Sequence, residues 1–388
     1  MYVRHLQVGD FRSYVTADLA LSPGVTTLLG LNGQGKTNLV EAIGYVASLS
    51  SHRVATDQPL VRFGADRATI RAAVCRHDRE TLVELELTPG RANRAKLNRA
   101  AAARPRDVLG VLRLVLFAPE DLALVKGDPS ERRRFLDDLL VARQPRWAGV
   151  RSEYDRVLRQ RNALLKSARP VLRPGPGRRP RPGDPALEEA RTSALHTLDV
   201  WNTQLAQVGA QLLYARLRLM RDLAPDLATA YSEVSASASE ARMSYRASLR
   251  EDAATRIAAG DVPAPEWLND ELLATFDQVR GAEIDRGVSL AGPHRDDVVL
   301  SLGDLPAKGY ASHGESWSLA LGLKLAAYEL LRRDLGEDPV LILDDVFAEL
   351  DVGRRNRLAE RVRDCEQVII TAAVPADVPP PLAASGMT

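Results

Sequence analysis

The spacing of hydrophobic residues divides the chain into three regions. Residues 1–125 contain short stretches in which apolar and polar residues alternate, which is the period of half-buried strands. These stretches are Tyr2–Val8, Thr16–Leu21, Thr69–Cys75 and Leu82–Leu87. Two apolar runs, Val25–Leu29 and Val111–Phe117, predict buried strands, whereas Thr37–Leu49 has the three- and four-residue spacing of a helix. The first region is therefore predicted to be rich in strands.

The second region, residues 126–285, changes to helical spacing. Apolar side chains recur on one helical face within residues 154–165, and a longer pattern of the same kind covers residues 187–223. Between them, residues 168–186 are rich in Pro, Gly and Arg, and we expect a loop there because proline interrupts the hydrogen bonds of a helix. The spacing predicts a mainly helical region that this Pro/Arg-rich loop divides.

Strand-like apolar runs return in the third region, residues 286–388. They are Val298–Leu302, Val340–Leu343 and Val368–Thr371. We find no internal repeat in the sequence and no heptad pattern that is sustained over the length a coiled coil requires. Strands on both sides of a helical region predict an α/β protein.

Composition excludes several classes of protein. With 45% hydrophobic and 27% charged residues, the chain of 388 residues has the composition of a globular protein. No stretch approaches 18 consecutive apolar residues, and the first residues lack the apolar core of a signal peptide. Cys75 and Cys365 are too few for a disulfide framework or a CxxC metal site. We therefore expect a cytoplasmic protein without a membrane partner.

The net charge of +1 conceals an uneven distribution of charge. Residues 91–106 carry six Lys or Arg and no acid, and residues 151–183 carry ten against two acids. Segregated basic stretches favour contact with a polyanion such as DNA. The alternative is that an Arg- and Ala-rich composition reflects a GC-rich genome, because six of the 52 basic residues are Lys.

One glycine-rich segment matches the phosphate-binding pattern G-x-x-x-x-G-K-[ST]. Its residues are Gly30, Leu31, Asn32, Gly33, Gln34, Gly35, Lys36 and Thr37. The segment follows a predicted strand and opens a predicted helix, which is the context that this motif requires. Backbone N–H groups and the helix N-terminus would bind phosphate, Lys36 would pair with the β- and γ-phosphates, and Thr37 would ligate Mg²⁺. The segment predicts an ATP·Mg²⁺ site.

A second half of this site is predicted at the end of the apolar run Val340–Leu343, where Asp344 and Asp345 follow. Such a run is weak evidence in isolation, because many buried strands end in aspartate. Beside a phosphate loop, Asp344 would hold Mg²⁺, and Asp345 would orient or deprotonate the attacking water. The predicted catalytic residues are therefore Lys36, Asp344 and Asp345.

The distance between the two halves along the chain predicts the architecture. Lys36 and Asp344 are 308 positions apart, although both must reach one nucleotide. We therefore predict an ABC-type P-loop ATPase lobe that both chain ends form, from residues 1–125 and 286–388. Residues 126–285 would be an inserted, mainly helical lobe, as in the ATPase heads of chromosome-maintenance proteins.

A third element precedes the acidic run by about 30 residues. Ser312 and Gly314 stand before a helix-compatible apolar stretch, where they could simply cap the helix or could offer N–H groups to a γ-phosphate. In ABC heads that phosphate belongs to the partner subunit. Residues 347–351 are similar to the loop that crosses such a dimer interface.

These motifs and several further segments resemble the RecF family of DNA replication and repair proteins. The matching segments are Gly9–Tyr14, Ser51–Arg53, Phe117–Leu122, Arg132–Asp137, Gly292–Asp297 and Leu343–Asp351. The resemblance implies an ATP-gated homodimer, with weak ATPase activity, that binds gapped DNA at single-strand/double-strand junctions. It also implies action with RecO and RecR in loading RecA, and roles in replication restart and the SOS response. By similarity Arg12 would lie near the nucleotide, and Ser312 with Gly314 would contact the other subunit's γ-phosphate.

The chain departs from the family's pattern in its signature, where His313 and Glu315 replace the usual glutamines. A carboxylate near a triphosphate is repulsive unless it turns away.

The alternatives to a recombination mediator are an ABC-type subunit of a transporter, a chromosome-structural head, or an ATPase fused to a nuclease. The long gap between the two motifs argues against a transporter subunit. The absence of sustained heptads and of a CxxC hook argues against a chromosome-structural head, and the absence of a further acidic metal cluster argues against a fused nuclease.

Overall fold

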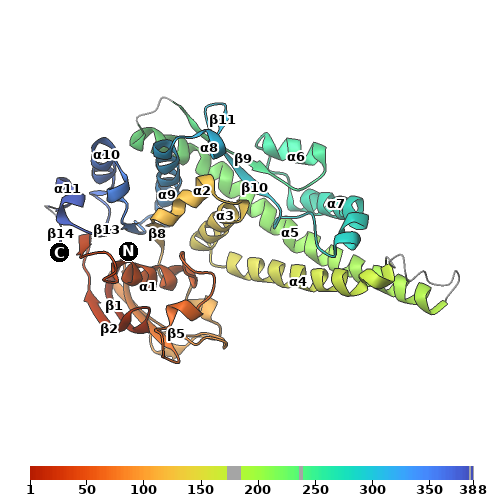
Figure 1. The fold of residues 1–388 in the computed structure, drawn as a ribbon, viewed down its shortest axis with the longest axis horizontal. Helices are drawn as coiled ribbons and strands as arrows, with labels where there is room; N and C mark the ends of the chain where they lie inside the picture. The colour runs from red at the N-terminus through yellow and green to blue at the C-terminus, as the bar shows by residue number, and fades with distance from the viewer. Residues whose placement is uncertain (173–184, 236–238, 384–385, 388) are drawn as a thin grey trace.

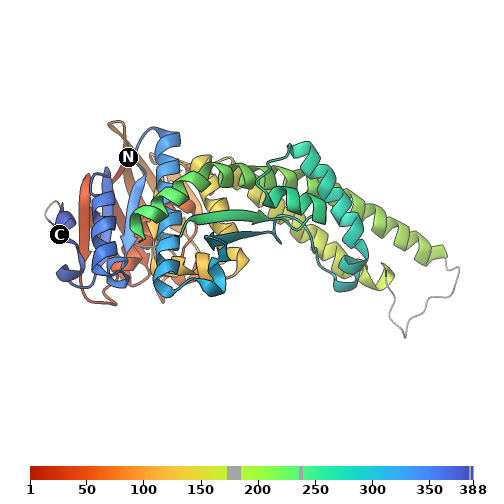
Figure 2. The same cartoon turned by 90° about the horizontal axis from the view of Figure 1, so that it is seen from above.

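The computed structural model describes residues 1–172, 185–235, 239–383 and 386–387. The molecule is elongated, with its two larger sheets at one end and long helices that extend to the other (Figures 1 and 2). Both chain termini lie at the end that holds the sheets (Figure 1). No helix within the described ranges has the length and apolar character needed to cross a lipid bilayer.

A five-stranded parallel sheet joins the two ends of the chain. In spatial order its strands are β14 (Gly386–Met387), β3 (Gly24–Leu29), β13 (Gln367–Ala372), β12 (Val340–Asp344) and β8 (Leu114–Phe117). Strand β13 lies between β3 and β12, and Thr371 pairs with both Leu28 and Asp344. The prediction that both chain ends build one α/β lobe around an inserted helical region is therefore confirmed.

A second, antiparallel sheet is built from the first hundred residues. Its order is β2 (Tyr14–Ala20), β1 (Tyr2–Phe11), β4 (Ala68–Arg76), β5 (Arg79–Leu87), β6 (Arg94–Leu97) and β7 (Ala100–Ala101). The basic stretch 91–106 includes β6 and β7, at one edge of this sheet. Helix α1 (Lys36–Ser48) shares a hydrophobic core with this sheet.

Alternate residues of the parallel sheet enter two different hydrophobic cores. Ile342 and Ile369 pack with α1 and the antiparallel sheet, whereas Leu343 and Ile370 pack with the long helices. Strands that are buried on both faces are near-continuous apolar runs, as Val340–Leu343 of β12 and Val368–Ile370 of β13 are. The parallel sheet is therefore the layer that connects the two cores.

Helices dominate the middle of the chain. They are α2 (Ala123–Lys126), α3 (Pro129–Arg143), α4 (Trp147–Leu172), α5 (Pro185–Val234), α6 (Glu251–Ala258) and α7 (Pro265–Arg286). Of these, α4 and α5 are the longest. Helices α8 (Ala307–Tyr310), α9 (His313–Leu335), α10 (Val352–Val362) and α11 (Pro380–Ala383) follow. Short 3₁₀ turns occupy Gln58–Leu60, Pro105–Val108, Pro119–Leu122, Phe347–Glu349 and Pro375–Asp377. The region boundaries 1–125, 126–285 and 286–388 stay a prediction.

Two features of the middle region differ from the sequence prediction. Helix α4 continues to Leu172 with Pro170 inside it, so residues 168–172 are helical and not a loop; residue 185 begins α5, and residues 173–184 lie outside the described residues. Packing of α4 on α5 outweighs the cost of about 3 kcal/mol that proline imposes on a helix. The structure also adds β9 (Ala241–Arg246), which the sequence did not predict and which pairs with the predicted strand β10 (Asp297–Leu302) in a small sheet of order β11 (Leu305–Pro306), β10, β9.

The segment Gly292–Asp297, for which the sequence suggested no role, joins several helices. Asp297 forms an ion pair with Arg132 of α3, with 2.8 Å between Nε and Oδ1. Asp296 accepts a hydrogen bond of 2.9 Å from the Tyr245 hydroxyl of β9. The Tyr154 hydroxyl of α4 lies 2.8 Å from the His294 ring. The segment therefore holds the first turns of the helical region against the small sheet.

A second buried ion pair holds the far part of the helical region together. Arg161 of α4 and Glu283 of α7 both have side chains that are 0% exposed, and 2.5 Å separates their charged atoms. Arg161 also donates to Asn202 of α5 at 2.8 Å and to Ser289 at 2.6 Å. A buried charge without a partner is costly, so each member of the pair depends on the other.

We expect Arg161→Met to lower the free energy of unfolding by about 3–5 kcal/mol, because it leaves the Glu283 carboxylate buried without a counter-charge. The matched control is Arg156→Met on the same helix. Arg156 pairs with Glu153 in solvent, and such exposed pairs contribute little to stability. Urea unfolding of both variants checks this, and equal losses would contradict it.

Candidate functional site

Residues 30–35 form a glycine-rich loop between β3 and α1. Gly33 and Gly35 have φ angles of +87° and +98°, a left-handed conformation that glycine adopts without strain. The loop tip, which consists of Leu31, Asn32, Gly33 and Gln34, is exposed. Helix α1 begins at Lys36 with no acidic side chain in its first turn, so its free N–H groups and its dipole favour an anion at this position.

The Lys36 ammonium is hydrogen-bonded to the backbone of the glycine-rich loop. Its Nζ donates to the backbone oxygens of Gly30 at 2.5 Å and Leu31 at 3.2 Å. Both acceptors are neutral carbonyls, so the loop keeps the full positive charge of the lysine. Loop, helix terminus and ammonium together form a positively charged cradle.

The turn between β1 and β2 braces this cradle. The Tyr14 hydroxyl donates to the Gln34 backbone oxygen at 3.3 Å, and Asn38 Nδ2 donates to Ser13 Oγ at 2.9 Å. A Cβ atom at Gly35 would stand 2.7 Å from the Tyr14 oxygen. Position 35 therefore requires glycine for two reasons, the φ angle and the tyrosine.

Thr37 and Asp344 meet across the boundary between α1 and the parallel sheet. Thr37 Oγ1 donates to Asp344 Oδ1 at 3.2 Å, although the residues are 307 positions apart. Asp344 is 2% exposed, and burial raises its pKa to about 6, with the negative charge of Asp345 adding to the rise. The structure therefore brings together the two motifs that the sequence predicted to share one ligand.

Thr371 at the end of β13 contacts both Asp344 and Asp345, a role that the sequence did not indicate. Its hydroxyl donates to Asp344 Oδ1 at 2.6 Å and accepts a hydrogen bond of 2.9 Å from the Asp345 backbone N–H. Asp345 has a φ angle of +51°, which is uncommon for a residue with a side chain and is concentrated at functional sites. A polar residue at the carboxyl end of an apolar run was the available signal.

Arg12 pairs with a buried carboxylate of α1. Its guanidinium donates to both oxygens of Glu41 on α1, at 2.8 Å and 2.6 Å, and Glu41 is 0% exposed. The Ser51 hydroxyl donates to the same carboxylate at 2.5 Å. Burial alone would raise the pKa of Glu41, but the hydrogen bonds from Arg12 and Ser51 hold it below its ordinary value. Glu41 thus fixes Arg12 beside the N-terminal half of α1.

Ser312 and Gly314 lie at the N-terminus of α9, and within the described ranges the structure does not bring them into contact with residues 30–37. Ser312 caps the helix: its hydroxyl accepts from the Glu315 N–H at 3.2 Å, and Glu315 accepts from the Ser312 N–H at 2.9 Å. The Glu315 carboxylate is therefore bound to the helix terminus. A Cβ at Gly314 would lie 2.8 Å from the Arg354 guanidinium, a contact that the sequence did not indicate.

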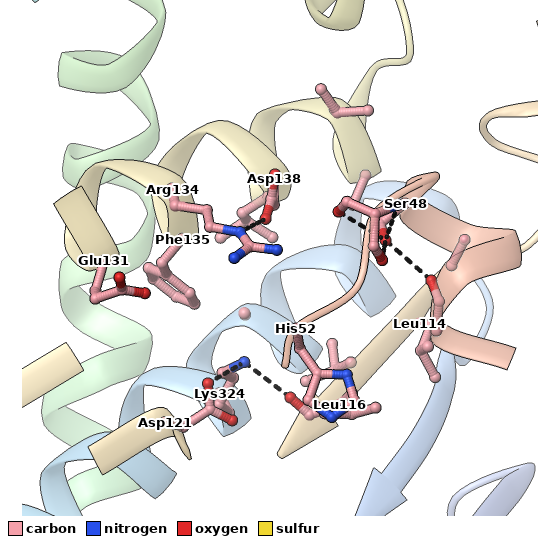
Figure 3. Close-up of a pocket in the computed structure, with 18 of the residues that line it drawn as sticks. Ser48, His52, Leu114, Leu116, Asp121, Glu131, Arg134, Phe135, Asp138 and Lys324 are labelled. Carbon is pink, nitrogen blue, oxygen red and sulfur yellow. Dashed lines mark hydrogen bonds and ion pairs between the residues drawn. The ribbon is translucent and has the colours of Figure 1, made fainter. Parts of the chain in front are cut away.

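A separate cavity of 450 Å³ lies between α1, β8, α3 and α9 (Figure 3). Lys324 points toward Asp121, with which it forms an ion pair of 2.8 Å, and donates to the Leu116 backbone oxygen at 2.8 Å. His52 lies on the same wall, and burial lowers its pKa. None of the predicted site residues lines this cavity, so it is distinct from the phosphate loop.

Known proteins resemble this chain over nearly its whole length. The family model of the RecF/RecN/SMC N-terminal domain matches residues 2–377. The protein of Kineococcus radiotolerans named "DNA replication and repair protein RecF" is 59% identical, over 98% of this chain and 94% of its own. The chain belongs to the RecF family. A relative of the same name from Streptomyces avermitilis is 55% identical, over 100% of this chain and 98% of its own.

Solved structures of the RecF family share the fold. The chain superposes on one described as "the recombination mediator protein RecF-ATP in RecFOR pathway" with a TM-score of 0.83 and 25% identity. The match covers 97% of this chain and 93% of the other. Family membership and the α/β ATPase-head fold therefore agree with the expectation from the sequence.

We expect Gly35→Ala to destabilise the protein more than Gly33→Ala. Alanine at position 33 meets no atom within 4 Å, so its cost is the left-handed φ, about 1–2 kcal/mol. Alanine at position 35 has the same cost and also collides with Tyr14. Urea unfolding gives the free energy of unfolding of both variants. When Tyr14→Ala is added to each, the difference in unfolding free energy between Gly35→Ala and Gly33→Ala should become smaller. Equal losses would show that Tyr14 does not brace the loop.

The Glu41 carboxylate should make stability depend on pH. Because its folded pKa lies below the ordinary value of 4.5, its contribution is present above that pH and is lost as the pH falls through the folded pKa. We expect the difference in unfolding free energy between the wild type and Glu41→Gln to be largest near neutrality and to shrink on acidification. Glu188→Gln, at an exposed position of α5, is the control. A difference independent of pH would contradict this role.

Proposed function

We propose that the chain is an ATP-dependent, DNA-binding recombination mediator that acts in gap repair, replication restart and the SOS response. The observation that carries the proposal is the contact between Thr37 and Asp344, which unites a phosphate loop with an acidic strand from the other chain end. Similarity over nearly the full length to proteins named for DNA replication and repair supports the biological context. The match to a RecF–ATP structure supports the choice of nucleotide.

The residues of the site suit ATP with Mg²⁺. The Thr37 hydroxyl and the Asp344 carboxylate are hard oxygen ligands 3.2 Å apart, the donor type that Mg²⁺ prefers. N–H groups of residues 30–37 and the Lys36 ammonium would hold the β- and γ-phosphates. Bound Mg²⁺ supplies neutralisation of the triphosphate charge. Asp345 would orient the attacking water and accept its proton, and Arg12 would stand near the phosphates.

A second copy of the chain would complete each site. Ser312 is exposed at the N-terminus of α9, where its hydroxyl and the N–H of the neighbouring Gly314 would meet the γ-phosphate of a partner. ATP would then favour the homodimer by mass action, and weak hydrolysis would release it. The Glu315 carboxylate is hydrogen-bonded to the Ser312 N–H, so a partner's γ-phosphate would have to displace it from the helix terminus.

The proposed partners follow from the same assignment. The dimer would bind gapped DNA at single-strand/double-strand junctions, with affinity that falls as salt rises. RecR and RecO would be its protein partners in the cytoplasm, and RecA would be loaded indirectly.

We expect Asp345→Asn to bind ATP normally and to prolong the ATP-dependent dimer on gapped DNA, because the amide cannot accept the proton of the attacking water. Mass photometry with ATP and junction DNA measures dimer lifetime, and phosphate release measures turnover. The comparison variant, Lys36→Arg, retains the charge but loses the compact ammonium, so it should weaken the dimer. Wild-type turnover in Asp345→Asn would overturn the role of Asp345, and a wild-type protein that stays monomeric with ATP would overturn the dimer.

A further inference from the structure

The cavity of 450 Å³ between α1, β8, α3 and α9 has the size of a small-molecule site, and the proposed function gives it no role. Pockets that bind small molecules usually measure about 300–1,000 Å³. Helix α1 and strand β8 precede the helical region of the chain, α3 belongs to it, and α9 follows it. A molecule bound in this cavity would therefore contact all three parts of the protein.

Much of the cavity wall is apolar. Leu114 and Leu116 of β8 line it, together with Phe135 and Leu139 of α3 (Figure 3). Gly44 of α1 also lines the cavity, and a Cβ atom there would stand 3.6 Å from Leu116 Cδ1, which is an ordinary contact. Glycine inside a helix is less favourable than alanine, and here the missing side chain leaves the space open.

Three cationic side chains of the wall each have an aspartate as partner. Lys324 lies 2.8 Å from Asp121. Arg151 and Arg134 lie 2.7 Å and 3.5 Å from Asp138. An ionic ligand would compete with these ion pairs, whereas a neutral ligand leaves them intact. The other charged side chains of the wall are exposed to solvent: Glu120, Glu131, Asp155 and Arg159.

His52 presents a polar atom that lacks a partner. Its Nε2 is buried, and none of the described residues forms a hydrogen bond with it. The ring lies on the cavity wall near Leu116 (Figure 3). Burial lowers the pKa of His52, so the imidazole is neutral at pH 7. A buried polar atom without a hydrogen bond is destabilising, so this nitrogen is where the polar group of a ligand would bind.

We propose that the cavity binds a small, neutral aromatic molecule that carries a hydroxyl group. The hydroxyl would bond to His52 Nε2, and because a hydroxyl both donates and accepts, it suits either tautomer of a neutral imidazole. The aromatic body would pack against Phe135, whose ring centre lies 5.9 Å from the Lys324 ammonium. An aromatic ligand at this position meets both a ring and a cation, which an aliphatic ligand would not exploit.

The probe is 2-naphthol, a neutral bicyclic aromatic alcohol, and naphthalene is the matched probe without the hydroxyl. Calorimetry on the full chain should give a dissociation constant for 2-naphthol below about 1 mM. His52→Phe keeps a ring but removes the nitrogen, so it should weaken 2-naphthol about tenfold and leave naphthalene unchanged. His52→Gln restores a polar atom and should recover part of the affinity. The control, His196→Phe, makes the same change at an exposed position of α5 and should alter neither affinity.

NMR of the protein with ¹⁵N-labelled histidine locates the bound probe, because the chain has six histidines. We expect 2-naphthol to shift the ring resonances of His52 and to leave those of His196 in place. This shift and the His52→Gln variant test the site even if His52→Phe does not fold.

Three outcomes would overturn the inference. They are the absence of saturable binding of 2-naphthol, binding that leaves the His52 resonances unmoved, and equal weakening of both probes by His52→Phe, which would mean that His52 only packs against the ligand. Failure of the proposed function would leave all of these measurements unchanged, because the probes carry no phosphate and none of residues 30–37 lines the cavity.

Discussion

The pairing of β13 with both β3 and β12 is the constraint on which the candidate site depends. Strand β3 leads into the phosphate loop, and β12 ends at the carboxylates. Neither strand touches the other, so their spacing is set by the strand between them. Thr371 of that strand then bonds Asp344 directly. The site is therefore a property of sheet order, and local sequence supplies only its separate parts.

The sequence could predict the features of the site that are local in the chain, and it could not predict those that depend on the order of strands in the sheet. The phosphate loop and α1 were predictable because a glycine pattern and a helical period are local. That Asp344 approaches Thr37 was predictable because both motifs serve one ligand. Thr371 was not, because whether a polar residue at a strand end faces a carboxylate depends on which strands are neighbours. The role of Glu41 was hidden for the same reason, since its partner Arg12 lies on another element.

Errors in the middle region have similar causes. Proline at position 170 favoured a loop, but the preceding face of α4 is packed on α5, and the helix continues for two more residues. Strand β9 has apolar residues at Ala241, Met243 and Tyr245, a correct alternation that is too short to stand out among long helices. Its partner, β10, begins at Asp297 and lies about 50 residues later in the chain.

The order of the parallel sheet also has a consequence for synthesis. Residues 367–372 pair with β3, which is made far earlier, so β3 has no neighbour on that side until β13 has been translated. Contacts of such long sequence separation form slowly, because the chain loses the entropy of closing a long loop before the contacts stabilise it. A nascent chain therefore carries the glycine-rich segment before β13 is present beside β3, and the contact between Thr37 and Asp344 requires β13 to be inserted between β3 and β12.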